Sequence, residues 1–115
     1  MSEKDKGNLL AILDSCTKIQ SFVDKLESAN SLYNDVKTFD AVLMNFLIIG
    51  ESVVKLSEEL KNQYGQVPWT KIKDFRNIVA HNYFGVDAEE VWQIIKNHLP
   101  VLERDINKIL GKSEL

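Results

Sequence analysis

The chain has 115 residues, 44% hydrophobic and 27% charged, which is the balance of an ordinary globular domain rather than of a disordered or fibrous chain. A chain of this length can bury a core without disulfides, and its single cysteine and polar opening segment favour a reducing, cytoplasmic setting. No apolar run approaches the ~20 residues of a membrane span, and the net charge of −3 argues against a broadly basic surface that coats nucleic acid.

Apolar residues at steps of three and four predict helices throughout the chain, and no segment shows the alternation typical of a strand. The first helix is predicted over residues 6–27. After a polar interruption, with Asp35 or Thr38 as the N-cap, a second helix is predicted over residues 36–63. Gly65 is expected to end it as the residue that follows the C-cap.

Three shorter helices are predicted to follow. Pro68 suits the first turn of a third helix over residues 68–83, because its missing N–H would be unpaired there in any case. Asp87, with a glutamate three positions later, resembles a capping box that opens a fourth helix over residues 88–98. A proline then breaks or restarts the chain into a last helix over residues 100–110.

Together these elements predict an all-α fold, an antiparallel bundle of four to five helices in one domain over residues 1–115. Gly50 stands in the middle of the second helix, where glycine costs about 1 kcal/mol relative to alanine, and we interpret it as a point of close approach by another helix. The same helix carries adjacent apolar pairs, a stripe wide enough for both core and subunit interface, although core packing alone could absorb it.

Several kinds of chemistry find little support in the sequence. Cys16 falls on the inward face of the first helix, where a thiol behaves as a small hydrophobic group. The two histidines, His81 and His98, lie 17 positions apart without further ligand motifs, so we predict no metal site. His98 is expected to pack in the core or at an interface. Glycine-rich phosphate-binding loops are absent from the sequence, and we predict no cofactor.

The candidate site lies in residues 71–83, a segment with three basic residues and one acidic residue. Arg76 can hold a phosphate group through two parallel hydrogen bonds, and the imidazole of His81 can move a proton near neutral pH. On a regular helix Arg76 and Tyr83 would lie about 20° apart in direction and His81 about 140° from Arg76. Either the arginine reaches around the helix or the helix unwinds near His81, which a glycine at Gly85 allows.

A fixed cation beside a titratable imidazole suffices to cleave RNA without a metal, because the ribose 2′-hydroxyl is itself the nucleophile. The bare pair of Arg76 and His81 is a pattern of low information, however. A structural arginine followed by a histidine that caps a helix therefore stays open as an alternative interpretation.

The order of motifs is more specific than this pair. The segment Arg76-Asn77-x3-His81-x-Tyr83-Phe84-x-Val86-Asp87, preceded by Ile48-Ile49-Gly50-Glu51 and Pro68-Trp69, resembles the HEPN superfamily, and more narrowly its HepT-like members. The resemblance covers about residues 5–111. It implies an all-helical RNase toxin of bacteria or archaea that forms homodimers with two motif copies facing one cleft. It also implies a partner, the minimal nucleotidyltransferase antitoxin MntA.

The resemblance further implies roles for individual residues. Arg76 and His81 match the catalytic pair. Tyr83 matches the tyrosine that accepts AMP from the nucleotidyltransferase, a modification that silences the ribonuclease. Glu51 would orient Arg76 through an ion pair, the alternative being an ordinary solvated helix charge. The supporting and phosphate-binding residues are Asn77, Lys73 and Glu51.

Two functions remain open at this stage. The first is the toxin of a toxin–antitoxin pair, an endoribonuclease of the cytoplasm with an RNA substrate, an MntA-like partner and a second copy of itself. The alternative is a non-catalytic helical subunit that binds substrate or nucleotide for a nucleotidyltransferase. In that case the surface of Arg76, His81 and Tyr83 would bind phosphate without cleaving anything.

Overall fold

The computed structural model describes residues 1–113, and helices make up most of this part of the chain. No strand occurs within it, so the all-α prediction is confirmed. The elements in chain order are α1 (Glu3–Val23), α2 (Ala29–Asn34), α3 (Val36–Lys55), α4 (Glu58–Gln63), α5 (Trp69–His81), the short 3₁₀ turn η1 (Tyr83–Gly85), α6 (Ala88–Asn97) and α7 (Leu99–Ser113).

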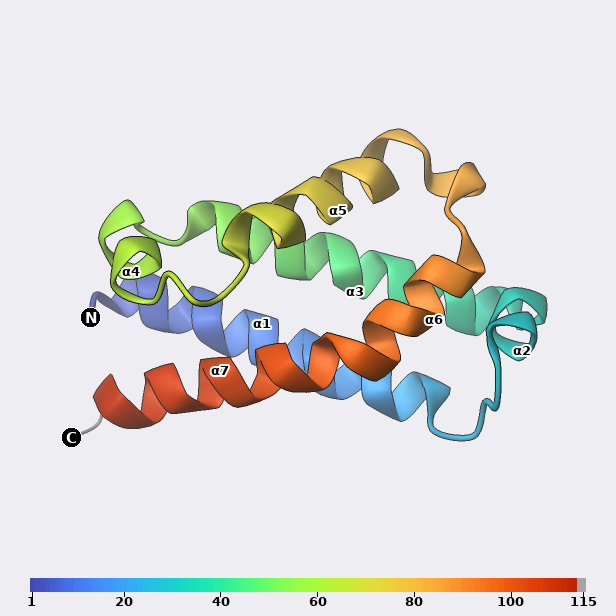
Figure 1. Cartoon of the computed structure of the whole chain (residues 1–115), viewed down its shortest axis with the longest axis horizontal. Helices are drawn as coiled ribbons and strands as arrows, with labels where there is room; N and C mark the ends of the chain where they lie inside the picture. Colours follow the sequence, from blue (N-terminus) through green and yellow to red (C-terminus); the bar gives the residue numbers. More distant parts are fainter. Residues whose placement is uncertain (114–115) are drawn as a thin grey trace.

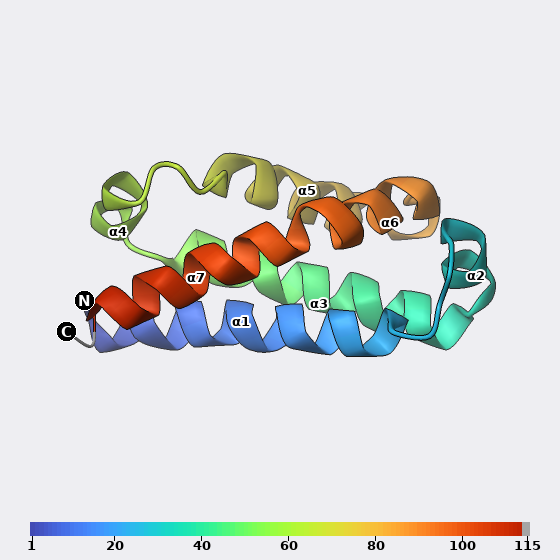
Figure 2. The same cartoon turned by 60° about the horizontal axis from the view of Figure 1, so that its bottom comes forward.

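The long helices α1 and α3 lie side by side in opposite directions and form the base of the bundle (Figures 1 and 2). Helix α7 packs against α1, and α5 packs against α3. The short helix α2 lies at the far end of the bundle, where it contacts α6. A continuous cluster of buried apolar side chains runs between these layers, with Leu9, Ile12, Ile19, Ile49 and Ile106 among its largest members. Helix α5 is thereby fixed as an outer helix on α3.

The predicted second helix is in fact two helices. Helix α3 ends at Lys55, Leu56 is extended, and Ser57 starts α4 by accepting a hydrogen bond from the Leu60 N–H. The apolar spacing continues across this break, so periodicity alone could not reveal it. Helix α4 ends at Gln63 with Tyr64 as its C-cap, so Gly65 follows the C-cap as predicted, but no glycine in the described residues has the positive φ of a left-handed cap.

Other helix ends also move. The first helix begins at Glu3, because Ser2 caps it, and it ends at Val23 rather than at residue 27. The unpredicted helix α2 forms through a capping box of Ser28 and Ser31. Of the two N-cap candidates for α3, Asp35 accepts the hydrogen bond, at 3.2 Å from the Thr38 nitrogen.

The C-terminal boundaries shift less. Helix α5 ends at His81, two residues before the predicted end, and α6 ends one residue early. Asp87 caps α6 as predicted and accepts the Glu89 N–H at 2.9 Å. Helix α7 runs over Leu99–Ser113 rather than residues 100–110, and its proline sits in the first turn, where no N–H is needed. With these breaks the described residues form seven α-helices instead of four to five.

Cys16 is fully buried on α1, as expected, and burial raises the pKa of its thiol to about 12. The thiol is therefore protonated and packs as an apolar group. None of the helices in residues 1–113 is long and apolar enough to cross a membrane.

A buried carboxylate joins the start of α1 to the corner between α3 and α4. Asp5, which is 5% exposed, accepts hydrogen bonds from the Ser57 N–H at 2.8 Å and from the Ser57 hydroxyl at 2.6 Å. Burial alone would raise the pKa of Asp5, but the hydrogen bonds from Ser57, with smaller contributions from Ser2 and the charge of Lys4, hold this pKa below its usual value. The charged form of Asp5 thus stabilises the corner that fixes where α3 ends.

Replacing Asp5 with asparagine is expected to lower the free energy of unfolding by about 1–3 kcal/mol near neutral pH. Because folding lowers the pKa of Asp5, its contribution is present above the unfolded-state pKa, about 3.9, and is lost as the pH falls through the folded-state value. Urea unfolding of wild type and Asp5→Asn at pH 7 and at successively lower pH measures both effects. The difference between the two proteins should shrink on acidification.

The matched control is Asp14→Asn, which removes an exposed carboxylate whose partner, Lys18, lies one turn away on the same helix. This change should cost no more than about 0.5 kcal/mol. Equal losses for the two variants would contradict the role assigned to Asp5.

Candidate active site

The position of Arg76 is set by the close packing of α5 on α3. A Cβ atom built on Gly50 of α3 would overlap the Cβ and Cγ atoms of Arg76 and would lie 3.5 Å from its Cα atom. Glycine is thus required here by the neighbouring helix, as the sequence analysis proposed. The contact places the stem of Arg76 directly over the backbone of α3, beside Glu51.

Arg76 forms an ion pair with Glu51, with 3.0 Å between Nη1 of the arginine and Oε1 of the glutamate. The side chain of Arg76 is 19% exposed and that of Glu51 is 52% exposed. The Arg76 Nε atom is buried and has no hydrogen-bond partner in the described part of the chain. The outer end of the guanidinium group is therefore the part that can meet a phosphate, and Glu51 holds it from one side.

His81 is the last residue of α5, and its exposed side chain forms no hydrogen bond or ion pair with any residue among 1–113. The backbone leaves the helix at Asn82, with φ −143° and ψ 49°, and the turn closes through a hydrogen bond from the Gly85 N–H to the Asn82 carbonyl at 3.0 Å. The helix therefore unwinds just after His81. The imidazole is left free to exchange protons with solvent or a ligand.

Regular helix geometry relates the candidate residues on α5. His81 follows Arg76 by about 7.5 Å along the axis and about 140° around it, and the exposed Lys73 and half-buried Asn77 fall within this arc. The four residues thus share one broad face of the helix, and no hydrogen bond joins the side chains of Arg76 and His81.

Tyr83 lies elsewhere than predicted, because α5 stops two residues before it. Its hydroxyl donates a hydrogen bond to Asp40 of α3, 3.2 Å from Oδ1 and 3.4 Å from the main-chain carbonyl oxygen. Asp40 and Glu51 are eleven residues apart on α3, or about 16 Å along the helix. The expectation that Tyr83 shares the direction of Arg76 is therefore wrong for this chain taken alone.

Asp40 is the residue of the site that the sequence analysis missed. Partial burial raises the pKa of Tyr83, and the hydrogen bond and negative charge of Asp40 raise it further. The signal in the sequence is spacing: Asp40, Met44, Ile48 and Glu51 follow one another at steps of four, four and three, which is one face of a helix. The spacing alone does not mark this face as part of the site, because that requires knowing that α5 and η1 pack beside it.

Apolar side chains are exposed on this face of α3. Met44, Ile48 and Val54 are all exposed, while Ile49 and Val53, their neighbours in the sequence, are buried in the core. The predicted apolar stripe is thus broader than the core uses. Phe84 is fully exposed. Its ring forms an edge-to-face pair with the ring of Tyr83, with 5.6 Å between the ring centroids.

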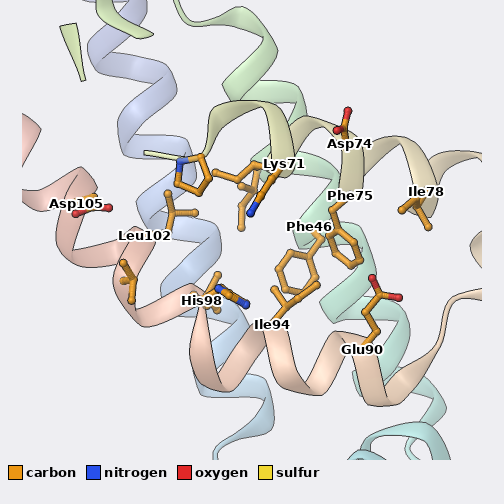
Figure 3. A pocket seen from close by; sticks show the side chains of 15 residues that line it. Phe46, Lys71, Asp74, Phe75, Ile78, Glu90, Ile94, His98, Leu102 and Asp105 are labelled. Carbon is orange, nitrogen blue, oxygen red and sulfur yellow. The ribbon is translucent and has the colours of Figure 1, made fainter. Parts of the chain in front are cut away.

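A separate groove of about 420 Å³ lies on the other side of α5, between this helix, α6 and α7 (Figure 3). Its floor is apolar and includes the edge-to-face pair of Phe46 and Phe75. His98 lines the groove and is exposed, so of the two places predicted for it the core is wrong, and an interface stays a prediction. None of the six predicted site residues lines this groove. Its charged lining residues are Lys71, Asp74, Glu90 and Asp105.

No three His, Cys, Asp or Glu side chains in residues 1–113 are grouped so that they could hold a metal ion. The face of Arg76 and His81 offers a fixed cation, a free imidazole, the amide of Asn77 and further cationic charge from Lys73. This set can bind a phosphodiester and move one proton, which is the chemistry of a ribonuclease.

Comparison with known proteins agrees with this class. The family profile described as "Ribonuclease HepT-like" matches residues 12–109. A candidate RNase of Methanocaldococcus jannaschii is 33% identical over 115 residues, covering 99% of this chain and 94% of the relative. A candidate HepT ribonuclease of Thermococcus cleftensis is 28% identical over 109 residues, covering 95% and 98%. No solved structure matches the chain significantly. The chain belongs to the HepT-like ribonucleases of the HEPN superfamily.

Gly50→Ala should be destabilising, because the added methyl group must displace Arg76 or separate α3 from α5. A loss of about 1–3 kcal/mol is expected, typical of overpacking, and it should be visible in urea unfolding. Gly7→Ala is the matched control, since a Cβ atom there meets nothing within 4 Å on an exposed part of α1, and it should stabilise by up to about 1 kcal/mol. Stabilisation by both changes would refute the packing role of Gly50.

Proposed function

We propose that this protein is the toxin of a toxin–antitoxin pair and acts as an endoribonuclease that needs no metal ion. The observation that carries the proposal is the intact motif on one face of α5, where Arg76 is anchored by Glu51 and His81 is exposed without a partner. Membership of the HepT-like ribonuclease family supports RNA as the substrate class.

The residues supply what RNA cleavage requires. The 2′-hydroxyl attacks the adjacent phosphorus and the 5′-oxygen leaves, giving a 2′,3′-cyclic phosphate and a free 5′-hydroxyl. His81 accepts the proton of the 2′-hydroxyl in this step, and the departing 5′-oxygen takes up a proton from solvent. Arg76 stabilises the negative charge that builds up on the phosphoryl oxygens. Lys73 and Asn77, on the same face of α5, bind the neighbouring phosphates of the chain.

The proposed active form is a two-fold homodimer in which both sites face one cleft. Arg76 and His81 diverge by about 140° on one helix, so a second copy helps to surround a single phosphodiester with both groups. The exposed Met44, Ile48 and Val54 beside Glu51 supply apolar surface for this interface.

The proposed antitoxin is an MntA-like minimal nucleotidyltransferase that transfers AMP to Tyr83. The hydroxyl of Tyr83 lies at the edge of the α3 face that leads past Met44 and Ile48 to Glu51 and Arg76. A nucleotide attached to Tyr83 and extending along this face would place negative phosphate and bulk in the path of RNA. The modification therefore silences the enzyme by exclusion and charge repulsion.

Purified protein is expected to cleave single-stranded RNA in the presence of EDTA and to leave 2′,3′-cyclic phosphate ends or their hydrolysis products. His81→Ala should reduce the rate at least about 100-fold, since the proton transfer is lost. His98→Ala is the control, because this second exposed histidine lies at the groove on the other side of α5. RNA binding without cleavage by wild type would favour the non-catalytic nucleotidyltransferase subunit instead.

Light scattering at micromolar concentration should give a mass near twice the 13.2 kDa of the chain. Ile48→Glu places a charge in the proposed interface and should shift the protein to the monomer and lower RNA cleavage. Leu10→Glu, which alters an exposed leucine on α1, should stay dimeric. A monomeric wild type with full activity would rule out the dimer.

Co-expression with the cognate nucleotidyltransferase should add one or more AMP groups to the wild-type protein, and intact-mass spectrometry should show none on Tyr83→Phe. Tyr33→Phe, which alters another exposed tyrosine, should be modified normally. The modified wild type is expected to lose RNA cleavage. Additions that map to another residue, or modified protein that cleaves RNA at the unmodified rate, would contradict the switch.

A further inference from the structure

The hydrogen bond between Tyr83 and Asp40 bears directly on how the tyrosine could be modified. In the described residues the Tyr83 hydroxyl has two hydrogen-bond acceptors, both on Asp40: its carboxylate at 3.2 Å and its main-chain carbonyl at 3.4 Å. The carboxylate is exposed at the side of α3 and forms no ion pair within residues 1–113. A base without a competing partner thus faces the one oxygen that would have to attack a nucleotide.

Nucleotide transfer to a tyrosine requires the loss of the phenol proton. Burial and the nearby carboxylate raise the pKa of Tyr83 above its ordinary value, so the hydroxyl is fully protonated near neutral pH. A neutral phenol is a weak nucleophile, and a group that accepts its proton during the attack removes this barrier. The same negative charge that disfavours a free phenolate is able to receive the proton in a concerted step.

We propose that the Asp40 carboxylate is the general base for AMP transfer to Tyr83, so that the toxin itself supplies a catalytic group for its own modification. The inference rests on the proposed function, in which Tyr83 is the acceptor of AMP from a nucleoside triphosphate bound to the nucleotidyltransferase. Asp40 also fixes the hydroxyl in one direction, which leaves the lone pairs of the oxygen for the incoming phosphorus.

In this step the bond between Oη of Tyr83 and the α-phosphorus forms. The bond from that phosphorus to the oxygen bridging the α- and β-phosphates breaks, and its electron pair leaves with pyrophosphate. The phenol proton passes to Oδ1 of Asp40 and then to solvent, to which this carboxylate is open. No oxidant, reductant or further reactant is needed.

Other groups of the site are poorly placed for this role. Glu51 lies about 16 Å along α3 from Asp40 and is already paired with Arg76. His81 makes no hydrogen bond to Tyr83. Asp40 is the titratable side chain in hydrogen-bond contact with the acceptor oxygen in the described part of the chain.

The test measures the initial rate of AMP transfer from labelled ATP by the purified nucleotidyltransferase to wild-type protein, Asp40→Asn and Asp74→Asn. Asparagine keeps an oxygen that can accept the Tyr83 hydrogen bond but cannot take the proton, so Asp40→Asn should be modified about 100-fold more slowly. Asp74→Asn removes an equally exposed carboxylate from α5 and should be modified at the wild-type rate. Thermal unfolding confirms that each variant is folded.

A second measurement separates proton transfer from a merely structural role. A fluorinated tyrosine at position 83 has a more acidic hydroxyl and should restore much of the lost rate in Asp40→Asn while changing the wild type little. Equal rates for Asp40→Asn and wild type, the result expected if the nucleotidyltransferase supplies its own base, would overturn the inference. Lost rate without rescue by the fluorinated residue would also overturn it. Failure of the proposed function is distinct, since wild-type protein would then accept no AMP at Tyr83.

Discussion

The contact between Gly50 and Arg76 is the constraint on which the site depends. Most helix pairs are held apart by side chains, but here the stem of an arginine lies against a bare stretch of backbone. This brings a residue of α5 close enough to α3 for its guanidinium to reach Glu51, the next residue along. A residue with any side chain at position 50 would push the cation outward, so the charge of the site and the packing of the bundle are fixed together.

Helix α3 in turn organises the whole motif. It holds Arg76 through Glu51 near its C-terminal half and Tyr83 through Asp40 near its N-terminal end, while α5 runs beside it in the opposite direction. Arg76 and Tyr83 are close together in the sequence motif, but the residues of α3 that bind them, Glu51 and Asp40, lie about 16 Å apart along that helix. Under the proposed function, RNA cleavage at Arg76 and His81 and acceptance of AMP at Tyr83 therefore take place at different points along this face.

The sequence was sufficient for the fold class and for the close helix approach at Gly50, because each depends on local spacing or on a residue type with one strong use. The ion pair of Arg76 with Glu51 was implied by the family resemblance, with a solvated glutamate as the open alternative, and the structure shows the pair. The sequence was insufficient where contacts between distant residues decide a helix end or the role of a side chain. Apolar periodicity runs through Leu56, yet Asp5 binds Ser57 from 52 residues away and breaks the helix there. Asp40 was missed for the same reason: in the sequence it is an ordinary helix carboxylate, and only the turn at η1 brings Tyr83 into contact with it on α3.

The position of α5 also reconciles an acidic protein with an RNA substrate. One side of this helix presents Lys73 and Arg76, and the other borders a groove whose lining includes Asp74, Glu90 and Asp105 against a single lysine. Net charge averages over both sides, whereas a polyanion responds to the local field of the surface it approaches, which salt screens beyond about 10 Å. The side of α5 with Lys73 and Arg76 is therefore more favourable for a polyanion than the side with the acidic groove.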